Sequence, residues 1–380
     1  MRFPELVYRN IVRRPFRTAL TLAALATAMT AIVALLGISR GFRRAFADVY
    51  GAHQIDIVVS RQGAADRLSS AVSEDASRQL SALPGVARTA GVLLETLSLE
   101  DEGIYGIPTM GLPSDSWLLA DYEVAGSAGP AAGPPQFSSP NARELLVGQN
   151  PADRLGLHSG ASLSVFGEPF RIVGVFRSHS VWENGSLILP LPVLQELTGR
   201  DGQVTYVNVV LESTTDLPSA VAAIEAVDPR LLALATAEFV QTDTRLKLAD
   251  GMAWMTSLVA MIIGGIGTLN TMMTSVHERT REIGILRAIG WPRGRIMLMI
   301  LLESCGLALA AAFIGGLAAY ALTGLLSRSP ATGGMIVPVI NATTLGQGFV
   351  IALGIGLLGA WLPARRAAAL LPTEAFREIS

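Results

Sequence analysis

The chain has 380 residues, of which 50 % are apolar and only 16 % are charged, whereas charged residues make up roughly a quarter of ordinary soluble domains. So few charges argue against a cytosolic enzyme. The net charge of −2 excludes the strongly basic face of a nucleic-acid-binding protein, and the single cysteine excludes a disulfide framework and a cysteine-based zinc site. With a mean hydropathy of +0.44, the composition indicates a membrane protein.

The apolar residues are concentrated in four runs that predict transmembrane helices. The runs lie at residues 18–39, 251–276, 296–326 and 343–364, and the third is interrupted only by Glu303. At 1.5 Å per residue, a helix of each length crosses a hydrocarbon core of about 30 Å. The first run is longer than the apolar part of a signal peptide, so we expect it to stay in the protein as a helix.

The positions of the arginines predict how these helices are oriented. Arginines are frequent in residues 1–17, in the loop 277–295 and in the tail 365–380, and nearly missing from the loop 327–342. Because cytoplasmic loops carry an excess of basic residues, both termini and the loop 277–295 are expected in the cytoplasm. The loop 327–342 and the long segment 40–250 are then expected outside.

The long segment 40–250 mixes strand and helix patterns, which predicts an α+β domain. Runs rich in β-branched residues indicate strands, and periodic apolar residues closed by Pro or Gly indicate helices. Strands are expected at 55–59, 170–176 and 204–210, helices at 73–83 and 217–227, and a Gly-, Ala-, Pro- and Ser-rich loop at 126–135. The fold class is therefore an α-helical membrane protein with four transmembrane helices plus a large α+β extracytoplasmic domain between helices 1 and 2.

The expected outer domain offers no catalytic or metal-binding pattern. His53, His158 and His179 are far apart and lack the spacing of metal ligands, so we interpret them as solvated or structural. Ser178 and Ser180 flank His179, but neighbouring residues of a strand point to opposite faces, so no nucleophile–base pair follows. We predict no catalytic residue and no metal site.

The loop 277–295 carries an apolar row at helical spacing. Ile283, Leu286 and Ile289 recur among charged residues, and Gly290 followed closely by a proline marks the end of a helix. We therefore expect a short amphipathic helix whose exposed apolar row contacts a protein partner or the lipid interface. The alternative is a solvated loop whose arginines only set the topology.

The sequence of this loop, ERTREIGILRAIG at 278–290, resembles the signature of the FtsX/MacB-type permeases of ABC transporters. Three other regions are similar to the same family: residues 9–18, Glu303 early in the third span, and the ending at 363–368 and 372–377. The resemblance implies a LolC/DevC-like permease, with a cytoplasmic amphipathic elbow before the first span and a MacB periplasmic core-like outer domain.

In this family a cytoplasmic ATPase docks on the helix of the loop 277–295, the coupling helix. The resemblance implies the following contact residues: Glu278, Arg281, Glu282, Ile283, Leu286 and Arg287. A P-loop needs a lysine, and the one lysine here, Lys247, follows no Gly-rich segment. The chain is therefore expected not to be an enzyme by itself, and to use ATP and Mg²⁺ only through two copies of a partner ATPase.

The function that the resemblance implies is mechanical. The expected permease couples ATP hydrolysis to movement of its outer domain (mechanotransmission) and exports or extracts a lipid, lipoprotein, peptide or drug. The alternative is a non-transporting FtsX-like regulator that activates an extracytoplasmic cell-wall hydrolase. Expected partners are the ATPase, a second permease copy or paralogue, a periplasmic adaptor protein and membrane lipids, without nucleic acid. The expected location is the bacterial plasma (inner) membrane, multi-pass, with both termini cytoplasmic.

Two features inside the spans predict helix contacts. A carboxylate at the centre of a transmembrane helix costs roughly 2.5–3.5 kcal/mol. Glu303 is therefore either a polar contact at a dimer or helix interface that senses the ATPase-driven motion, or a residue at headgroup level. Small residues four positions apart let helices approach closely. These small residues are Ala311, Gly315, Ala319, Gly356 and Ala360.

Overall fold

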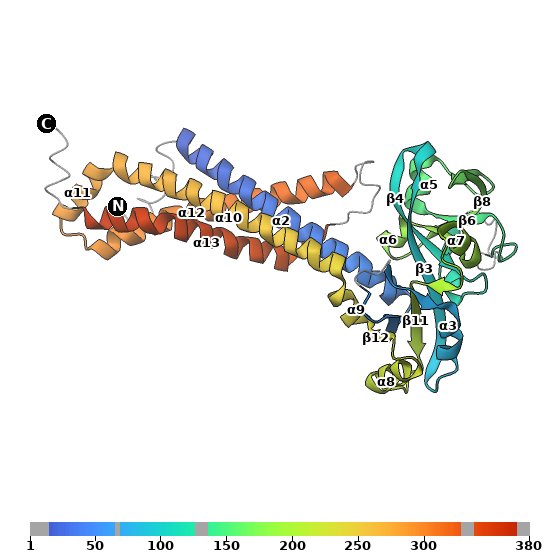
Figure 1. Ribbon diagram of the computed structural model, residues 1–380. Helices are drawn as coiled ribbons and strands as arrows, with labels where there is room; N and C mark the ends of the chain where they lie inside the picture. Colours follow the sequence, from blue (N-terminus) through green and yellow to red (C-terminus); the bar gives the residue numbers. More distant parts are fainter. Residues whose placement is uncertain (1–14, 65–68, 126–135, 328–337, 371–380) are drawn as a thin grey trace. The chain divides into compact units, whose positions relative to one another are not determined.

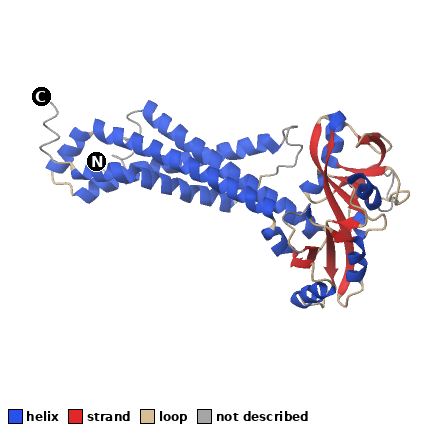
Figure 2. Cartoon of the chain, in the orientation of Figure 1, coloured by secondary structure: helices blue, strands red, loops and turns tan. Residues whose placement is uncertain are grey.

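The computed structural model describes residues 15–64, 69–125, 136–327 and 338–370. The chain divides into a helical unit and an α+β unit (Figure 2). Among the described residues, the helical unit holds residues 15–40, Asp250–Leu325 and residues 338–370, and the α+β unit is mainly Gly41–Ala249. The expected loop 126–135, nearly all of the elbow, and much of the outer loop and the tail lie outside the described residues.

Within the described residues, the helical unit contains four long helices and one short helix. The helices are α2 (Pro15–Ala52), α10 (Thr244–Glu278), α11 (Thr280–Ala288), α12 (Arg293–Ser327) and α13 (Ala342–Ala369). The four long helices are each long and apolar enough to cross a membrane, and they lie alongside one another (Figure 1). The prediction of four transmembrane helices is confirmed. Each helix extends past its apolar run, since helical hydrogen bonds also form in water, where charged side chains are solvated.

Small residues bring the long helices close together. A Cβ atom at Gly315 of α12 would lie 2.6 Å from the Cβ of Met29 in α2, and one at Gly356 of α13 would lie 2.8 Å from the Cβ of Ala308 in α12. A larger side chain has no room at either position. All five small residues singled out in the sequence are buried: Ala311, Gly315, Ala319, Gly356 and Ala360.

The α+β unit contains a ten-stranded mixed sheet with the order β12-β1-β11-β3-β4-β9-β6-β8-β5, in which β7 also pairs with β8. The strands of this sheet are β1 (Ile57–Arg61), β3 (Val86–Leu99), β4 (Ile104–Leu112), β5 (Glu123–Ala125), β6 (Glu144–Gly148), β7 (Ser162–Val165), β8 (Glu168–Arg177), β9 (Leu187–Pro190), β11 (Tyr206–Leu211) and β12 (Leu231–Ala235). Two pairs, β4–β9 and β6–β8, are parallel. A small second sheet joins β2 (Val72–Ser73) to β10 (Gln203–Val204).

Short helices accompany the sheet. They are α3 (Glu74–Ser81), η2 (Glu100–Glu102), α4 (Trp117–Ala120), α5 (Gln149–Leu155), α6 (Val181–Asn184), α7 (Leu191–Thr198), α8 (Leu217–Val227) and α9 (Thr236–Thr242). The expected helix 217–227 agrees with α8 at both ends. The expected strand 204–210 is divided at Thr205 between β10 and β11.

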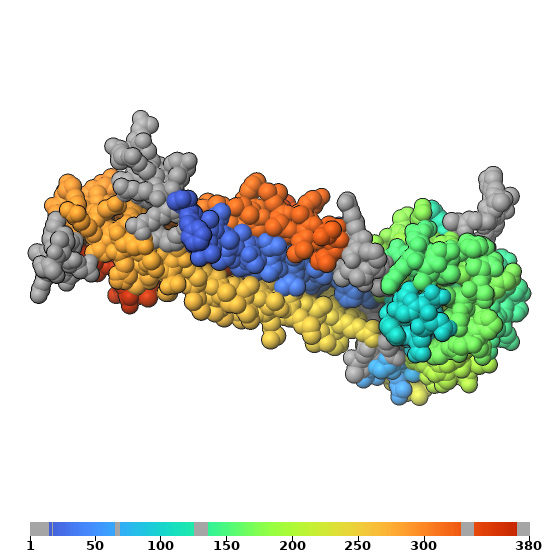
Figure 3. Space-filling model, turned by 90° about the horizontal axis from the view of Figure 1, so that it is seen from above, coloured from blue at the N-terminus to red at the C-terminus, as the bar shows by residue number. Residues whose placement is uncertain are grey.

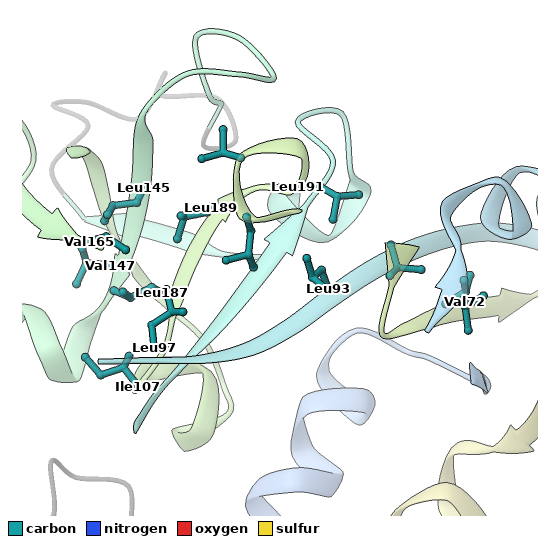
Figure 4. Packing of buried hydrophobic residues seen from close by; sticks show 14 of the residues in the cluster. Val72, Leu93, Leu97, Ile107, Leu145, Val147, Val165, Leu187, Leu189 and Leu191 are labelled. Atoms are coloured by element: carbon teal, nitrogen blue, oxygen red, sulfur yellow. The ribbon is translucent and has the colours of Figure 1, made fainter. Parts of the chain in front are cut away.

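Both faces of the large sheet are buried. In β1, Ile57 and Val59 belong to one hydrophobic cluster, which includes residues of α3, α7 and α8. Val58 belongs to a second cluster, which includes residues of α4, α9 and the end of α2. Figure 4 shows Leu93 and Leu187 among the residues of the first cluster. Because successive side chains of a strand alternate between faces, strands covered on both sides are apolar at almost every position.

A buried polar cluster surrounds His53, one residue after the end of α2. The imidazole Nδ1 lies 2.9 Å from Oδ2 of Asp121, and Nε2 lies 3.0 Å from Oε1 of Glu183. The Tyr122 hydroxyl donates to the same Glu183 oxygen at 2.8 Å, and the Ser178 hydroxyl donates to the other oxygen. Burial lowers the pKa of His53, but the hydrogen bonds and charges of Glu183 and Asp121 outweigh burial and raise that pKa above its ordinary value. His53 is thus a structural histidine.

Residues 180–182 contact the end of α2 within the α+β unit. The Ser180 hydroxyl donates to the carbonyl oxygen of Ala45 at 3.0 Å, and the rings of Phe46 and Trp182 pack with centroids 5.5 Å apart. His179, which lies between Ser178 and Ser180 in the sequence, is exposed. Ser178 and Ser180 therefore have separate structural partners, and they form no catalytic pair with His179.

Candidate coupling site at the end of the helical bundle

The site begins where α10 gives way to α11, at one end of the helical unit (Figure 1). Arg279 breaks the helix between Glu278 and Thr280. At the other end of α11, Gly290 has a φ of +99°. The Gly290 N–H donates to the carbonyl of Arg287, and the next N–H, of Trp291, donates to the carbonyl of Leu286, both at 3.1 Å. This pair of bonds is a Schellman motif, so the predicted helix stop at Gly290 is confirmed.

One side of α11 faces the helical bundle. The Ile283 side chain is 2 % exposed and packs in a cluster to which α10, α12 and α13 all contribute. The other members of this cluster are Val276, Ile296, Met299, Ile300, Ala364 and Ala367. Leu286 is half-buried against the same cluster. The expectation of an exposed apolar row is therefore wrong for Ile283 and only partly right for Leu286, because the ends of three long helices cover this side of α11.

The opposite side of α11 carries a different set of residues. Its exposed residues are Arg281, Glu282, Ile285, Ala288 and Ile289, and Ile289, just after the helix, is 72 % exposed. Ile285 was missing from the expected contact set, although its spacing of four from Ile289 is a helical signal. Two apolar side chains beside an arginine and a glutamate make a small amphipathic surface, which we call the outer face of α11.

An ion pair connects this region to the third long helix. Arg279 donates through Nη1 to both carboxylate oxygens of Glu303 in α12, at 3.0 and 3.4 Å. The side chains are 15 % and 7 % exposed, respectively. Arg279 also lies 3.4 Å, through Nε, from the more exposed carboxylate of Glu282. Glu303 is thus buried in a contact within one chain. Arg279 was not among the contact residues expected from the sequence. The sequence analysis used it only as one of the arginines that mark the loop 277–295 as cytoplasmic.

The remaining residues of the expected set occupy the rim of the site. Glu278 is exposed at the end of α10, and Arg287 is half-buried. Arg287 donates from Nη1 to the carbonyl of Trp291 at 2.9 Å, and the guanidinium of Arg295 lies 4.5 Å from the centre of the Trp291 ring. These contacts fix the turn between α11 and α12. Among the described residues, no group of histidine, cysteine and carboxylate side chains is arranged to hold a metal ion.

The contacts of the site fix α11 to the helical bundle. The outer face of α11 is accessible, while Ile283 on its inner side and the Arg279–Glu303 ion pair join it to three long helices. These contacts restrict tilting or shifting of α11 against the bundle, because packed interiors tolerate little change in spacing.

Two relatives indicate how far the similarity extends. The chain is 26 % identical over 385 residues to the macrolide export ATP-binding/permease protein MacB of Vibrio parahaemolyticus, which covers 94 % of this chain and 57 % of that protein. It is 28 % identical over 235 residues to the uncharacterized ABC transporter permease YknZ of Bacillus subtilis, which covers 57 % of this chain and 56 % of that protein. The chain therefore spans little more than half of the length of these relatives.

Two solved structures resemble the chain over about half of its length. The periplasmic region of MacB from Actinobacillus actinomycetemcomitans matches with 10 % identity and a TM-score of 0.39, covering 50 % of this chain and 94 % of that one. The extracellular domain of the noncanonic ABC-type transporter YknZ from Gram-positive bacteria matches with 15 % identity and a TM-score of 0.36. This match covers 47 % of this chain and 98 % of that one.

Two family models match the chain in sequence. Residues 254–372 match the FtsX-like permease C-terminal model. This range of the chain includes α11, its outer face and Glu303. Residues 18–227 match the MacB-like periplasmic core domain, and this match alone covers more than half of the chain. With four transmembrane helices and an α+β domain between the first two, the chain belongs to the FtsX/MacB-like permease family of ABC transporters.

Proposed function

We propose that the chain is the permease subunit of an ABC transporter and that it converts ATP hydrolysis by a separate cytoplasmic ATPase into movement of its outer domain. In this proposal the protein lies in the bacterial inner membrane with α11 and both termini in the cytoplasm, as the arginine distribution favours. The transporter exports or extracts a lipid, lipoprotein, peptide or drug. The observation that carries the proposal is the accessible outer face of α11 on a helix tied to the bundle by a buried ion pair.

The first step of the proposed mechanism is docking of the ATPase. Arg281 and Glu282 offer charged contacts, and Ile285 and Ile289 offer apolar area on the same side. Interfaces of this kind combine a few desolvated apolar anchors with a polar rim. Ile283 then acts indirectly, because it holds α11 in place rather than touching the partner. Two ATPase copies serve two permease chains, one on each outer face.

The second step is transmission along the helices. Displacement of α11 acts on α10 through the chain, on α12 through the Arg279–Glu303 ion pair and on α13 through the cluster around Ile283. At the other end, α2 and α10 each contain residues of the α+β unit, Gly41–Ala52 and Thr244–Ala249. Two of the four long helices therefore continue without a break into the segment that is expected to move.

The test is affinity purification of the full chain in mild detergent with identification of the bound proteins by mass spectrometry. We expect an ABC ATPase to co-purify, and we expect Ile285→Asp together with Ile289→Asp to abolish its recovery. Leu217→Asp is the matched control, since this leucine is exposed on α8 of the α+β unit and its substitution should leave recovery unchanged. Retention of the ATPase by the double variant contradicts the docking site. Co-purification of a cell-wall hydrolase with the chain supports the regulatory alternative.

A further inference from the structure

A cavity of about 360 Å³ lies in the α+β unit, where the end of β1 meets the start of β12. Small-molecule sites measure roughly 300–1,000 Å³, so the cavity is large enough to hold one. Its walls come from Arg61, from positions within 71–79 and from positions within 228–231. The chain that follows β1, light blue in Figure 3, reaches the surface of the α+β unit. Arg61 and Gln79 on the wall are exposed, so the cavity is open to solvent.

The floor of this cavity is apolar. Val72, labelled in Figure 4, is buried in the first hydrophobic cluster together with Ala76 and Leu231, and all three line the cavity. An apolar cavity of about 150 Å³ holds one benzene molecule. The larger volume found here therefore has room for an organic molecule of about a dozen non-hydrogen atoms, with its apolar part on this floor.

The Arg61 side chain lies on the same face of the sheet as this floor. Arg61 is the last residue of β1 and pairs in register with Leu231 of β12, and directly opposite residues of antiparallel strands share a face. The Arg61 backbone N–H donates to the Ser70 hydroxyl oxygen at 3.0 Å. In the part of the chain that the structure describes, no group forms an ion pair or a hydrogen bond with its guanidinium. The charge of Arg61 is therefore available to a ligand.

The other charged side chains of the cavity have partners of opposite charge. The Asp228 carboxylate lies 2.8 Å from the Arg230 guanidinium, and the Asp75 carboxylate lies 2.7 Å from the guanidinium of Arg78. Each of these pairs is neutral, so one positive charge, that of Arg61, is left in excess. A single excess positive charge is complementary to a ligand with one negative charge.

We propose that this cavity binds a small organic monocarboxylate. Its carboxylate lies on the guanidinium of Arg61, which can hold both oxygens at once, and the Ser73 hydroxyl and the Gln79 amide on the cavity wall supply further donors. Its apolar part lies on the floor. A phosphate monoester carries about 1.5 to 2 negative charges and matches the excess charge less well. All these residues belong to the α+β unit, so the proposal goes beyond the permease function and does not depend on it.

The proposal is tested by photolabelling of the full chain in lipid nanodiscs. The probe is para-benzoylbenzoate, which joins a carboxylate to a photoreactive apolar body, and labelled peptides are identified by mass spectrometry. We expect labelling of the peptides that contain Val72 and Leu231, suppression of this labelling by excess benzoate, and at least fivefold less labelling by para-benzoylbenzamide, the uncharged analogue. Equal labelling by the two compounds, or labelling of other peptides only, overturns the proposal.

Two variants supply the second part of the test. Arg61→Gln removes the excess charge, and we expect it to lower the labelling by para-benzoylbenzoate at least fivefold. The matched control is Arg177→Gln, because Arg177 is likewise an exposed arginine at the end of a strand, β8, but does not line the cavity. Unchanged labelling with Arg61→Gln, or an equal loss in both variants, overturns the proposal.

A third variant tests the cavity without changing a charge. Ala71→Leu enlarges a half-buried side chain of the cavity wall, and we expect it to lower the labelling at least fivefold while the thermal unfolding temperature stays close to that of the native protein. Undiminished labelling with Ala71→Leu overturns the cavity as the site. The measurement needs no ATPase, so a failed docking test with intact labelling refutes the docking site alone.

Discussion

Arg279 and Glu303, 24 residues apart in sequence, form a buried ion pair between the start of α11 and the third long helix, with 3.0 Å between Nη1 and Oε2. The pair explains how a carboxylate is accommodated in α12 among apolar neighbours, because a buried charge is tolerated when it is paired and hydrogen-bonded. The pair also connects Glu303, whose carboxylate is costly to insert into a membrane, directly to the segment proposed to receive the ATPase.

Replacing Glu303 by glutamine is expected to destabilise the protein and to uncouple it. Glutamine keeps a hydrogen-bond acceptor but leaves the buried Arg279 guanidinium with only the more exposed carboxylate of Glu282 as a counter-charge. Removal of one partner from a buried pair costs roughly 3–5 kcal/mol, and the retained acceptor keeps the loss below that range. We expect a lower thermal unfolding temperature in detergent and normal recovery of the ATPase, whose contact surface is unchanged, with reduced transport-linked ATP turnover.

The matched control for this variant is Glu282→Gln. Glu282 faces the same arginine at 3.4 Å, but its side chain is 48 % exposed, and exposed ion pairs contribute only about 0–1 kcal/mol. The control should therefore unfold close to the temperature of the native protein. Equal loss of stability in the two variants would show that the buried Arg279–Glu303 pair contributes no more to stability than the exposed pair does.

A second prediction concerns the close contact between α2 and α12. Gly315→Ala places a Cβ atom 2.6 Å from that of Met29 and 2.7 Å from the carbonyl oxygen of Ala26, so the two helices must separate. Overpacking of this kind costs roughly 1–3 kcal/mol. Gly324→Ala in the same helix meets nothing within 4 Å and should instead stabilise by about 0.5–1 kcal/mol through helix propensity. Thermal unfolding of the two variants in parallel distinguishes them, and shifts of the same sign would contradict the contact.

Much of the fold was predictable because its signals are local. The ends of α8 agree with the expected helix 217–227, where Asp216 caps the first turn by accepting from the Ser219 N–H. The strand at 204–210 was harder to delimit. Both faces of the sheet are buried, so the alternation that normally marks a strand is lost there.

The coupling site was only partly predictable for a different reason. Helical spacing places Ile283 and Leu286 on one side of α11, but spacing does not say whether that side faces water or other helices. The answer depends on α12 and α13, which are distant in sequence. The Arg279–Glu303 pair is a tertiary contact of the same kind, and periodicity within a segment carries no information about it.

A third prediction tests how α11 is terminated. Gly290 has a φ of +99°, a conformation that costs a residue with a Cβ atom roughly 1–2 kcal/mol. Gly290→Ala should therefore weaken the Schellman turn and increase hydrogen exchange at the N–H of Trp291, which bonds to Leu286. Gly294→Ala, four residues later in α12 with open space around its Cβ position, is the control and should not increase this exchange. Unchanged exchange in Gly290→Ala would refute the cap.

The last prediction follows from the buried cluster around His53. Its imidazole lies between Asp121 and Glu183, and Tyr122 and Ser178 donate to Glu183 from the remaining sides. The folded-state pKa of His53 is raised above the ordinary value of 6.5. A group with a raised folded pKa stabilises the fold fully below its unfolded pKa, and this contribution is lost as the pH rises through the folded pKa. The protonated imidazole thus contributes most to stability in acidic solution.

Replacing His53 by glutamine should remove this pH dependence, because an amide does not titrate. We expect the variant to be less stable than the native protein near pH 6, with the difference shrinking as the pH rises through the raised folded-state pKa of His53. Thermal unfolding of the full chain followed by tryptophan fluorescence measures it, since Trp117 lies 6.5 Å from the imidazole, centre to centre. His179→Gln is the control, because His179 is exposed and its replacement should leave the pH profile unchanged. A stability difference for His53→Gln that stays constant or grows with rising pH would contradict a protonated imidazole at the end of α2.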